Sequence, residues 1–289
     1  MKAIRLILGL VSASLTFSHQ AIADDWFMPT PLASTYSALA AGNTQLAWQE
    51  MLLALSQKPI DERHWAKAKK TLISQSQCGK QLISDAPMSQ EQHIRLTIQK
   101  KTNLVQQGYQ LKVSLDGVEQ SAAISLRDQQ GRVWFSGKTS EPEQNYVELE
   151  SDDLVYAPTS GFYQLTIDQA VYPIILSSNY EQPWIKVNRN NAVSSMSIRQ
   201  PKTLPSCQIA NMRWQWFDDQ FSMLGYSQPI QLNSSNVETE GFESARLPES
   251  FPSNAKWLSA VVSQWEYQGV VKVEYAQRVT LPNYLKVSN

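Results

Sequence analysis

The chain has 289 residues, of which 42% are hydrophobic and 18% charged, and 26 Asp and Glu balance its 25 Lys and Arg. A globular chain of this length can hold two or three domains with their own cores. Its near-neutral balance argues against nucleic acid as a partner, because phosphate binding needs a basic surface. The densest basic run, Lys67-Ala68-Lys69-Lys70, has the spacing of a solvated helix face.

The first 23 residues have the parts of a secretory signal peptide. Lys2 and Arg5 give a positive head, residues 4–15 are mostly apolar, and small residues lead up to Ala23, where a signal peptidase cleaves. A transmembrane anchor is the alternative, but serines interrupt the apolar run, which is shorter than the roughly 20 residues that a span needs. We expect cleavage after Ala23 and a periplasmic mature chain of 266 residues, with a formal charge of −3 and no membrane span.

Residues 24–88 have a helical pattern and are expected to form a small helical domain. The stretch TQLAWQEMLLALSQ, residues 44–57, carries apolar residues at helical spacing, and Asn43 or Thr44 can cap it. Pro59 ends this helix, and DERHWAKAKKTLIS supplies the next one. A peptide-binding pair of tetratricopeptide-like helices is an alternative, but the repeat of about 34 residues that marks such proteins is missing.

From residue 89 the pattern changes to short segments with alternating apolar residues. About seven such segments precede residue 178, at the intervals typical of a β-sandwich. One of them, SGFYQLTI at residues 160–167, is similar to the late strand of immunoglobulin-like sandwiches. This resemblance implies that the hydroxyl of Tyr163 bonds to the backbone upstream, as in a tyrosine corner. Residues 89–182 are therefore expected to form a sandwich domain.

Residues 183–289 contain a second set of strand-like segments. The last two are expected to pair in a long hairpin through Gln268-Gly269. Before this hairpin, residues 233–256 are polar and broken by glycine and proline, so we expect a long mobile loop. The predicted fold class is α+β, with a small N-terminal helical bundle followed by two mostly antiparallel, immunoglobulin-like β-sandwich domains.

Cys78 and Cys207 are the only cysteines in the chain. In an exported protein two thiols usually end as one disulfide, because the periplasm is oxidising. A catalytic thiol is the alternative, and it would need an unpaired sulfur and a basic partner. We expect a structural disulfide that ties the helical domain to the last domain across the middle one.

Motifs of nucleotide-binding and acyl-transfer enzymes are incomplete in this sequence. Gly131 and Gly137 are one residue too far apart for a phosphate-binding loop. Ser253 and Lys256 match the Ser-x-x-Lys pattern of penicillin-binding enzymes, but the companion Lys-Thr-Gly is absent. We therefore expect a non-enzymatic protein with no catalytic residue and no cofactor, although hydrolases can assemble a site from distant positions.

The histidines and paired acids give no metal or acid–base pattern. His64 and His93 do not have the spacing of metal ligands, so no metal site is expected. Asp152-Asp153 and Asp218-Asp219 are adjacent pairs, and neighbours on a strand point to opposite faces. Both pairs are better explained as solubilising turn residues.

Tryptophan is the unusual feature, with nine in the chain. Trp214 and Trp216 would share one face of a strand, and Trp257, Trp265 and Tyr267 one face of another. Stacked aromatic rings can bind the sugars of peptidoglycan or of a surface polysaccharide, whereas the alternative is that they pack in a sandwich core. Trp214, Trp216, Trp265 and Tyr267 are therefore the candidate ligand-facing aromatics.

The stretch DWFMPTPLASTYSALAAGNTQLAWQEMLLAL, residues 25–55, with the strand-rich remainder, resembles a family of uncharacterised exported proteins from Vibrio and related gammaproteobacteria. The resemblance implies a Gram-negative periplasm and brings no activity with it. We expect a protein that binds another cell-envelope component, such as an envelope or periplasmic protein, as an accessory factor in sensing or assembly. A glycan-binding or peptidoglycan-binding module that uses the tryptophans is the alternative.

Overall fold

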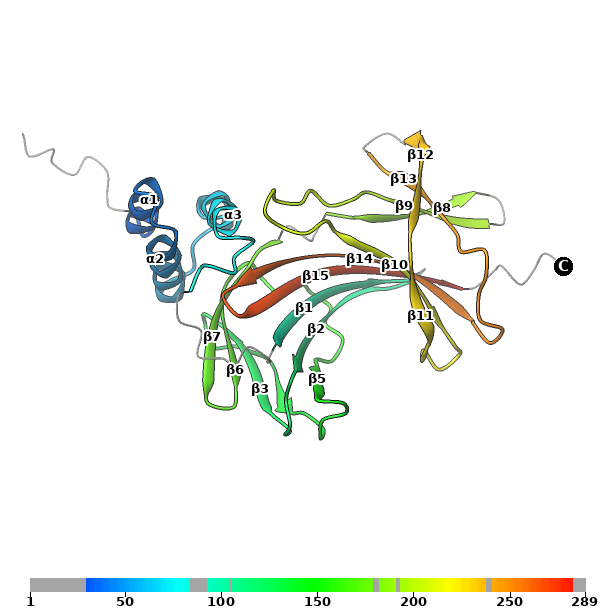
Figure 1. The fold of residues 1–289 in the computed structure, drawn as a ribbon, viewed down its shortest axis with the longest axis horizontal. Helices are drawn as coiled ribbons and strands as arrows, with labels where there is room; N and C mark the ends of the chain where they lie inside the picture. The colour runs from blue at the N-terminus through cyan, green and yellow to red at the C-terminus, as the bar shows by residue number, and fades with distance from the viewer. Residues whose placement is uncertain are drawn as a thin grey trace, which may run out of the picture.

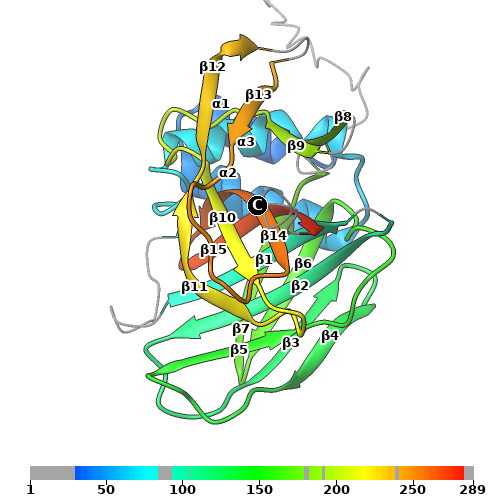
Figure 2. The same ribbon diagram turned by 90° about the vertical axis from the view of Figure 1, so that its right-hand side faces the viewer.

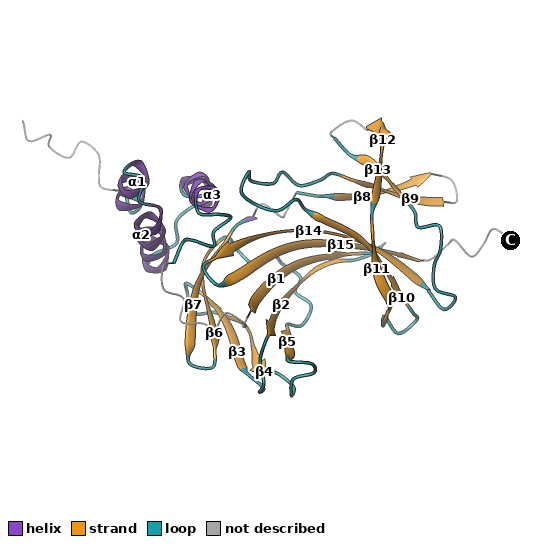
Figure 3. Cartoon of the chain, viewed as in Figure 1, coloured by secondary structure: helices purple, strands orange, loops and turns teal. Residues whose placement is uncertain are grey.

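The computed structural model describes residues 30–83, 93–103, 105–178, 182–190, 193–237 and 241–282. The predicted signal peptide lies outside these residues. The described chain is mostly β, with three α-helices gathered at one end and strands forming the rest (Figures 1 and 3).

The helical end contains three α-helices and one short 3₁₀-helix: α1 (Ala33–Ala40), α2 (Thr44–Gln57), η1 (Glu62–His64) and α3 (Ala66–Gln75). The predicted helix at 44–57 is confirmed as α2. Its cap is Asn43, whose side chain accepts a hydrogen bond from the backbone N–H of Leu46 at 3.1 Å. It ends at Gln57, and the next residue, Lys58, has the extended backbone that a following proline favours. None of the described helices has the length and hydropathy needed to cross a membrane.

The three helices bury their apolar side chains in one cluster that also reaches the β-rich part. Trp48, Met51, Trp65 and Leu72 are fully buried in it. Ile175, from a strand, belongs to the same cluster and is also fully buried. The helices are therefore packed onto the β-rich part and share their apolar core with it.

Fifteen strands form the β-rich part of the described chain: β1 (His93–Thr102), β2 (Gln107–Asp116), β3 (Ala123–Asp128), β4 (Val133–Lys138), β5 (Tyr146–Glu150), β6 (Gly161–Ile167), β7 (Ala170–Leu176), β8 (Ile185–Asn190), β9 (Val193–Ile198), β10 (Asn211–Phe217), β11 (Met223–Pro229), β12 (Gln231–Val237), β13 (Glu243–Arg246), β14 (Trp257–Gln268) and β15 (Val271–Pro282). They make three sheets, of order β11-β10-β14-β15-β1-β2-β5, β12-β13-β9-β8 and β4-β3-β6-β7. Figure 2 looks from the end opposite the helices and separates the two four-stranded sheets, one above and one below.

The seven-stranded sheet joins the two regions that the sequence separates at residue 182. β1 and β15 lie side by side in parallel, with Ile94 opposite Val271. The other strand pairs in the described chain are antiparallel. Strands from 89–182 and from 183–289 therefore share one hydrogen-bonded sheet, and the expected boundary does not divide the sheets.

The expected long loop at residues 233–256 is wrong in part. β12 extends to Val237, and β13 occupies Glu243–Arg246 and pairs with both β12 and β9. The register between β12 and β13 shifts between Asn233 and Val237. Such a bulge breaks the two-residue alternation on which strand prediction depends, so the segment has the composition of a loop. By contrast, the predicted hairpin through Gln268-Gly269 is confirmed, because β14 and β15 pair from Gln268–Val271 onward.

The two faces of the seven-stranded sheet differ in chemistry. One face carries Leu96, Val113, Ala260 and Val273, which are buried in the main apolar core. Both four-stranded sheets contribute to that core, for example through Leu126 of β3 and Ile198 of β9. Because side chains alternate along a strand, the residues between these positions lie on the opposite face, which we call the polar face.

Tyr163 forms the contact that its resemblance implied. Its hydroxyl donates to the backbone oxygen of Thr159 at 2.7 Å, and its ring lies 6.2 Å from that of Trp134. Burial raises the pKa of Tyr163 to about 12, from 10.0. The hydroxyl must therefore stay neutral for the folded state to keep this contact.

Tyr163→Phe is expected to lower the free energy of unfolding at pH 7 by about 1 kcal/mol, because the Thr159 carbonyl loses its donor. The raised pKa of Tyr163 sets the pH dependence. The contribution of its hydroxyl to the free energy of unfolding is complete below pH 10 and is lost as the pH rises towards about 12. Urea unfolding of both proteins at pH 8 to 12 tests this. The same alkaline slope in the two proteins would contradict it.

Candidate functional site

The predicted disulfide between Cys78 and Cys207 is confirmed. Their sulfurs are bonded, their Cα atoms lie 4.8 Å apart, and 129 positions separate them in the chain. The bond joins the segment after α3 to the segment before β10, and Cys78 is only 4% exposed. Neither cysteine is a free thiol, so a catalytic Cys207 is excluded while the bond is intact.

The segment around Cys78 fits tightly against the β14–β15 hairpin. The backbone N–H of Tyr267 donates to the Cys78 oxygen at 2.8 Å, and that of Gly269 donates to the Gly79 oxygen at 3.3 Å. Gln77, Cys78 and Gly79 all have positive φ, which turns the chain sharply at this point. A Cβ on Gly79 would lie 1.7 Å from the backbone oxygen of Tyr267. Only glycine therefore fits this contact without moving the hairpin.

Gly79→Ala is expected to cost about 2 kcal/mol more unfolding free energy than Gly42→Ala. Both glycines have positive φ, but a Cβ on Gly42 meets no atom within 4 Å. The difference in unfolding free energy between the two variants therefore measures the cost of the steric clash with the β14–β15 hairpin. Urea unfolding followed by tryptophan fluorescence measures it, and equal losses would show that the hairpin moves freely.

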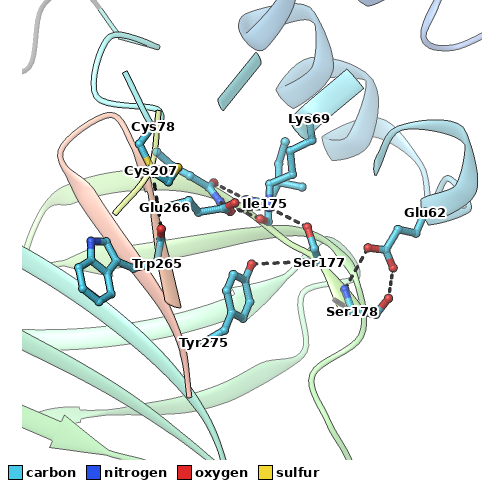
Figure 4. Close-up of polar contacts among 11 residues, drawn as sticks. Glu62, Lys69, Cys78, Ile175, Ser177, Ser178, Cys207, Trp265, Glu266 and Tyr275 are labelled. Carbon is cyan, nitrogen blue, oxygen red and sulfur yellow. Dashed lines mark hydrogen bonds and ion pairs between the residues drawn. A yellow bond between two sulfur atoms is a disulfide. The ribbon is translucent and has the colours of Figure 1, made fainter. Parts of the chain in front are cut away.

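A buried polar cluster lies beside the disulfide, where α3 meets the sheets (Figure 4). Lys69 of α3 is 2% exposed, and its Nζ lies 2.5 Å from Oε1 of Glu266 on β14. The same Nζ donates to the Oγ of Ser177 at 2.7 Å. The sequence predicts Lys69 on a solvent-exposed helix face. This prediction is wrong, because Lys69 is buried against Glu266 and Ser177, which are distant in the chain. The spacing of residues along the helix carries no information about such distant partners.

Two further contacts extend this cluster. The side-chain amide of Gln268 donates to Glu266 at 2.9 Å and to the Ile175 oxygen at 2.8 Å, and its Oε1 accepts from the Ile175 N–H at 2.8 Å. Glu62 of η1 accepts hydrogen bonds from both the backbone and the hydroxyl of Ser178. Charge and hydrogen bonds therefore join the helices, β7 and β14 in addition to the disulfide.

Lys69 and Ser177 have the contact of a serine–lysine pair but not its chemistry. A nucleophilic serine needs a neutral amine to take its proton and a space for substrate. Here the ammonium is held by the Glu266 carboxylate, and Ser177 is only 4% exposed. Two surface hollows, of about 770 Å³ beside the α1–α2 turn and about 620 Å³ beside the β6–β7 turn, include neither residue. The cluster is built to hold elements together.

Two of the four candidate ligand-facing aromatics are buried, which corrects their expected role. Trp214 and Trp216 are each 1% exposed and belong to the main apolar core. The indole N–H of Trp214 donates to the Arg246 oxygen at 3.1 Å, and the ring of Trp216 lies 5.6 Å from that of Phe251. The alternation of side chains along the strand correctly predicted that the rings of Trp214 and Trp216 share a face. It does not indicate that another sheet covers this face.

Trp265 and Tyr267 lie on the polar face and are half-buried. The ammonium of Lys272 stands 4.0 Å from the centre of the Trp265 ring, and that of Lys80 stands 4.8 Å from the Tyr267 ring. A pyranose that stacks on either ring would have to displace a lysine from that face. These two aromatics are part of a charged surface and do not form an open platform.

The remaining residues weighed in the sequence have local roles. His64 and His93 are exposed, and no metal-binding group of His, Cys, Asp or Glu occurs in the described parts of the chain. Asp218 accepts backbone N–H bonds from Gln220 and Ser222, as a turn aspartate does. Asp153 pairs with Lys101.

Three exposed apolar side chains lie on or beside β11, an edge strand of the seven-stranded sheet. Tyr226 is 95% exposed, Met223 54% and Phe221 53%. The register between β10 and β11 shifts so that residues 225–227 lie opposite Gln215 alone. This bulge, with positive φ at Gly225, turns Tyr226 away from the sheet. We call Phe221, Met223 and Tyr226 the β11 patch.

The two edges of the seven-stranded sheet are protected differently. β5, at one edge, carries Glu148 and Glu150, and Lys112 of β2 lies 3.3 Å from each carboxylate. β11, at the other edge, has no charged residue from 221 to 229. Natural sheets commonly use charge to keep edges from associating, and apolar side chains at an uncharged edge are typical of a contact surface. Phe221 is already ordered there, since its ring stacks on Trp257 at 5.0 Å.

Comparison with known proteins gives a family. The family described as "Protein of unknown function (DUF2861)" matches residues 26–284. The chain belongs to this family. The match extends from the segment before α1 to just beyond β15, so the helical end and all three sheets fall within one family unit. No curated protein matches the chain.

Solved structures give only distant likenesses. A tetra-tandem repeat in the extending region of a large adhesion protein is 13% identical, with 65% of this chain and 49% of that one covered and a TM-score of 0.18. The I-band fragment I67–I69 of titin is 10% identical, with 67% and 66% covered and a TM-score of 0.18. Pullulanase from Anoxybacillus sp. LM18-11, complexed with maltotriose, is 7% identical, with 61% and 25% covered and a TM-score of 0.16. This chain spans about half of the adhesion repeat, and TM-scores this low carry no argument about function.

Proposed function

We propose that this member of the DUF2861 family is a non-enzymatic periplasmic protein that binds another cell-envelope protein through the β11 patch. Its role is that of an accessory factor in envelope sensing or assembly. The single observation that carries the proposal is a fully exposed tyrosine beside an exposed methionine and phenylalanine at an uncharged sheet edge.

The chemistry of the β11 patch defines its partner. Tyrosine, with two side-chain torsions and a large ring, loses little conformational entropy when it is buried and is enriched among residues that dominate interface energy. No charge of β11 has to be desolvated on contact. The partner therefore presents an apolar pocket for Tyr226, with an uncharged rim for Met223 and Phe221.

The proposed location rests on sequence and covalent chemistry together. The N-terminal segment has the composition of a signal peptide, and a disulfide is typical of an oxidising compartment. The proposal includes cleavage after Ala23, the source in Vibrio and related gammaproteobacteria, and an immunoglobulin-like relationship for the sandwich-like parts. Tyr163 and its bond to Thr159 support the last of these.

The test compares two tyrosines of similar exposure. Tyr226→Ser and the control Tyr156→Ser, whose wild-type tyrosine is 81% exposed, are expressed in the native host and crosslinked in cells. One discrete envelope protein is expected to copurify with wild type and with Tyr156→Ser, and at least about tenfold less with Tyr226→Ser. Equal recovery from the two variants would contradict the role of the patch.

A second arm tests the glycan alternative. Purified protein is sedimented with peptidoglycan sacculi, and we expect no saturable binding. Sedimentation that Trp265→Ala abolishes, while Tyr226→Ser leaves it intact, would replace the proposal by the glycan-binding one.

A further inference from the structure

The polar face of the seven-stranded sheet gathers cations from four strands. Register places Arg95 of β1 opposite Lys272 of β15, and Lys272 opposite Tyr267 of β14. Arg213 of β10 lies opposite Val261, and Ser263 and Trp265 occupy the two positions of the same face of β14 between these rows. Directly opposed residues share a face, so all these side chains project from the side away from the main core.

Three of these cations have no anionic partner among the described residues. Lys101 and Lys112, on the same face, pair with Asp153 and with Glu148 and Glu150. Arg95, Arg213 and Lys272 form no ion pair and no hydrogen bond within the described ranges, and the Lys272 ammonium lies over the Trp265 ring. The face therefore holds unneutralised positive charge.

Hydrogen-bond donors on this face are also without acceptors. The Nε atoms of Arg95 and Arg213 and the hydroxyl of Ser263 are buried and have no partner in the described chain. Ser263 itself is 0% exposed. A buried donor that is left unpaired costs free energy, and its recurrence in one place indicates a missing acceptor.

The charges are close enough to act on each other. Burial lowers the pKa of Lys272, and the charges of Arg95 and Arg213 lower it further, whereas the carboxylates of Glu274 and Asp116 raise it. Glu274 lies on the same face and accepts from Thr97 at 3.3 Å. It and Asp116 offset part of the positive charge, to which Arg278 of β15, opposite Val261, adds. An anionic acceptor would neutralise the positive charge that remains.

We propose that the polar face is a binding site for a phosphate group, held by Arg95, Arg213 and Lys272 with Ser263 beneath them. Phosphate brings several acceptor oxygens, and arginine binds it through two parallel N–H bonds. Trp265 and Tyr267 border the site and can contact the group that carries the phosphate. The ligand class is a phosphate ester, either on a lipid headgroup or on a soluble molecule. This site is separate from the β11 patch and does not depend on it.

Calorimetry with inorganic pyrophosphate at low ionic strength tests the site on the full mature chain. Saturable binding of one pyrophosphate is expected, weakened at least about tenfold by each of Arg95→Gln, Arg213→Gln and Lys272→Gln. Lys101→Gln and Lys112→Gln are the matched controls, because they remove cations from the same face that already have partners. Both controls are expected to keep the wild-type affinity.

No saturable heat with folded wild type, or equal losses in the site variants and the two controls, would overturn the proposal. Because a site variant can fail to fold, the wild-type Tm gives a second readout. Pyrophosphate is expected to raise the wild-type Tm, whereas chloride at matched ionic strength is expected to leave it unchanged. Equal effects of the two salts on the Tm would also overturn the proposal.

Flotation with phosphatidylcholine vesicles, with and without phosphatidic acid, then identifies the source of the phosphate. Flotation that requires phosphatidic acid and is lost in Arg95→Gln assigns a lipid headgroup. Pyrophosphate binding without flotation assigns a soluble phosphate ester. Either outcome, with the variants behaving as expected, supports the phosphate site.

Discussion

Replacing both Cys78 and Cys207 by serine is expected to lower the free energy of unfolding by about 4 to 5 kcal/mol. The disulfide closes a loop of 129 positions, so its removal gives the unfolded chain much more conformational freedom. The loop contains nine whole strands and part of the seven-stranded sheet. Urea unfolding followed by the nine tryptophans measures the loss.

The double alanine variant is the control for packing. Cys78 is buried in the helical core, where serine introduces a hydroxyl and alanine does not. If chain entropy dominates, the alanine and serine variants lose similar stability. A loss below about 1 kcal/mol in both variants would mean that the noncovalent contacts of the helices already fix the segment without the bond.

Lys69→Met is expected to lower the free energy of unfolding by about 3 kcal/mol, because the partly buried Glu266 carboxylate loses its cation and, among the described residues, keeps only the Gln268 amide as a donor. Glu266 is 17% exposed, so water relieves only part of that loss. Lys70→Met, one position along the same helix and exposed to solvent, is the matched control and is expected to change stability by less than about 0.5 kcal/mol.

A third variant separates the charge from the packing. Adding Glu266→Gln to Lys69→Met is expected to recover part of the stability, because no unpaired charge then remains at the junction. Thermal and urea unfolding of the three variants give the comparison. If Lys69→Met costs no more than Lys70→Met, the buried ion pair does not hold the helices to the sheet.

Local patterns predicted the local elements well. The cap at Asn43 and helical spacing placed α2, and alternation around Gln268-Gly269 placed the β14–β15 hairpin. The disulfide was predicted from a pair of cysteines and from the expectation that the chain is exported to an oxidising compartment. These predictions depend on neighbours in sequence or on composition, both of which a single chain shows directly.

Contacts between residues that are distant in the chain could not be predicted from the sequence. Nothing near Thr97 indicates that Glu274, 177 positions away, lies on the next strand, or that Lys69 will meet Ser177 at a separation of 108. The same limit hid the polar face, because its cations come from four strands whose order only the sheet defines. The alternation of side chains along a strand predicts which of them share a face. Which of the two faces is buried depends on how the sheets pack, and the sequence does not show this.

The β11 patch and the polar face give the protein two surfaces of different chemistry. The patch is apolar and uncharged, whereas the polar face is cationic and rich in unpaired donors. The disulfide and the Lys69 cluster fix the helices to the sheet that carries both surfaces. Two separate surfaces on one frame fit the proposed role, which is to bring envelope components together.

Site-specific photocrosslinking in living cells tests the central claim most directly. A benzophenone side chain is placed at position 226 or, as the control, at position 156, and the periplasmic fraction is analysed after irradiation. We predict one discrete adduct with an envelope protein from position 226 and none from position 156. No adduct from position 226, or the same adduct from both positions, would contradict the proposal that the β11 patch binds a partner.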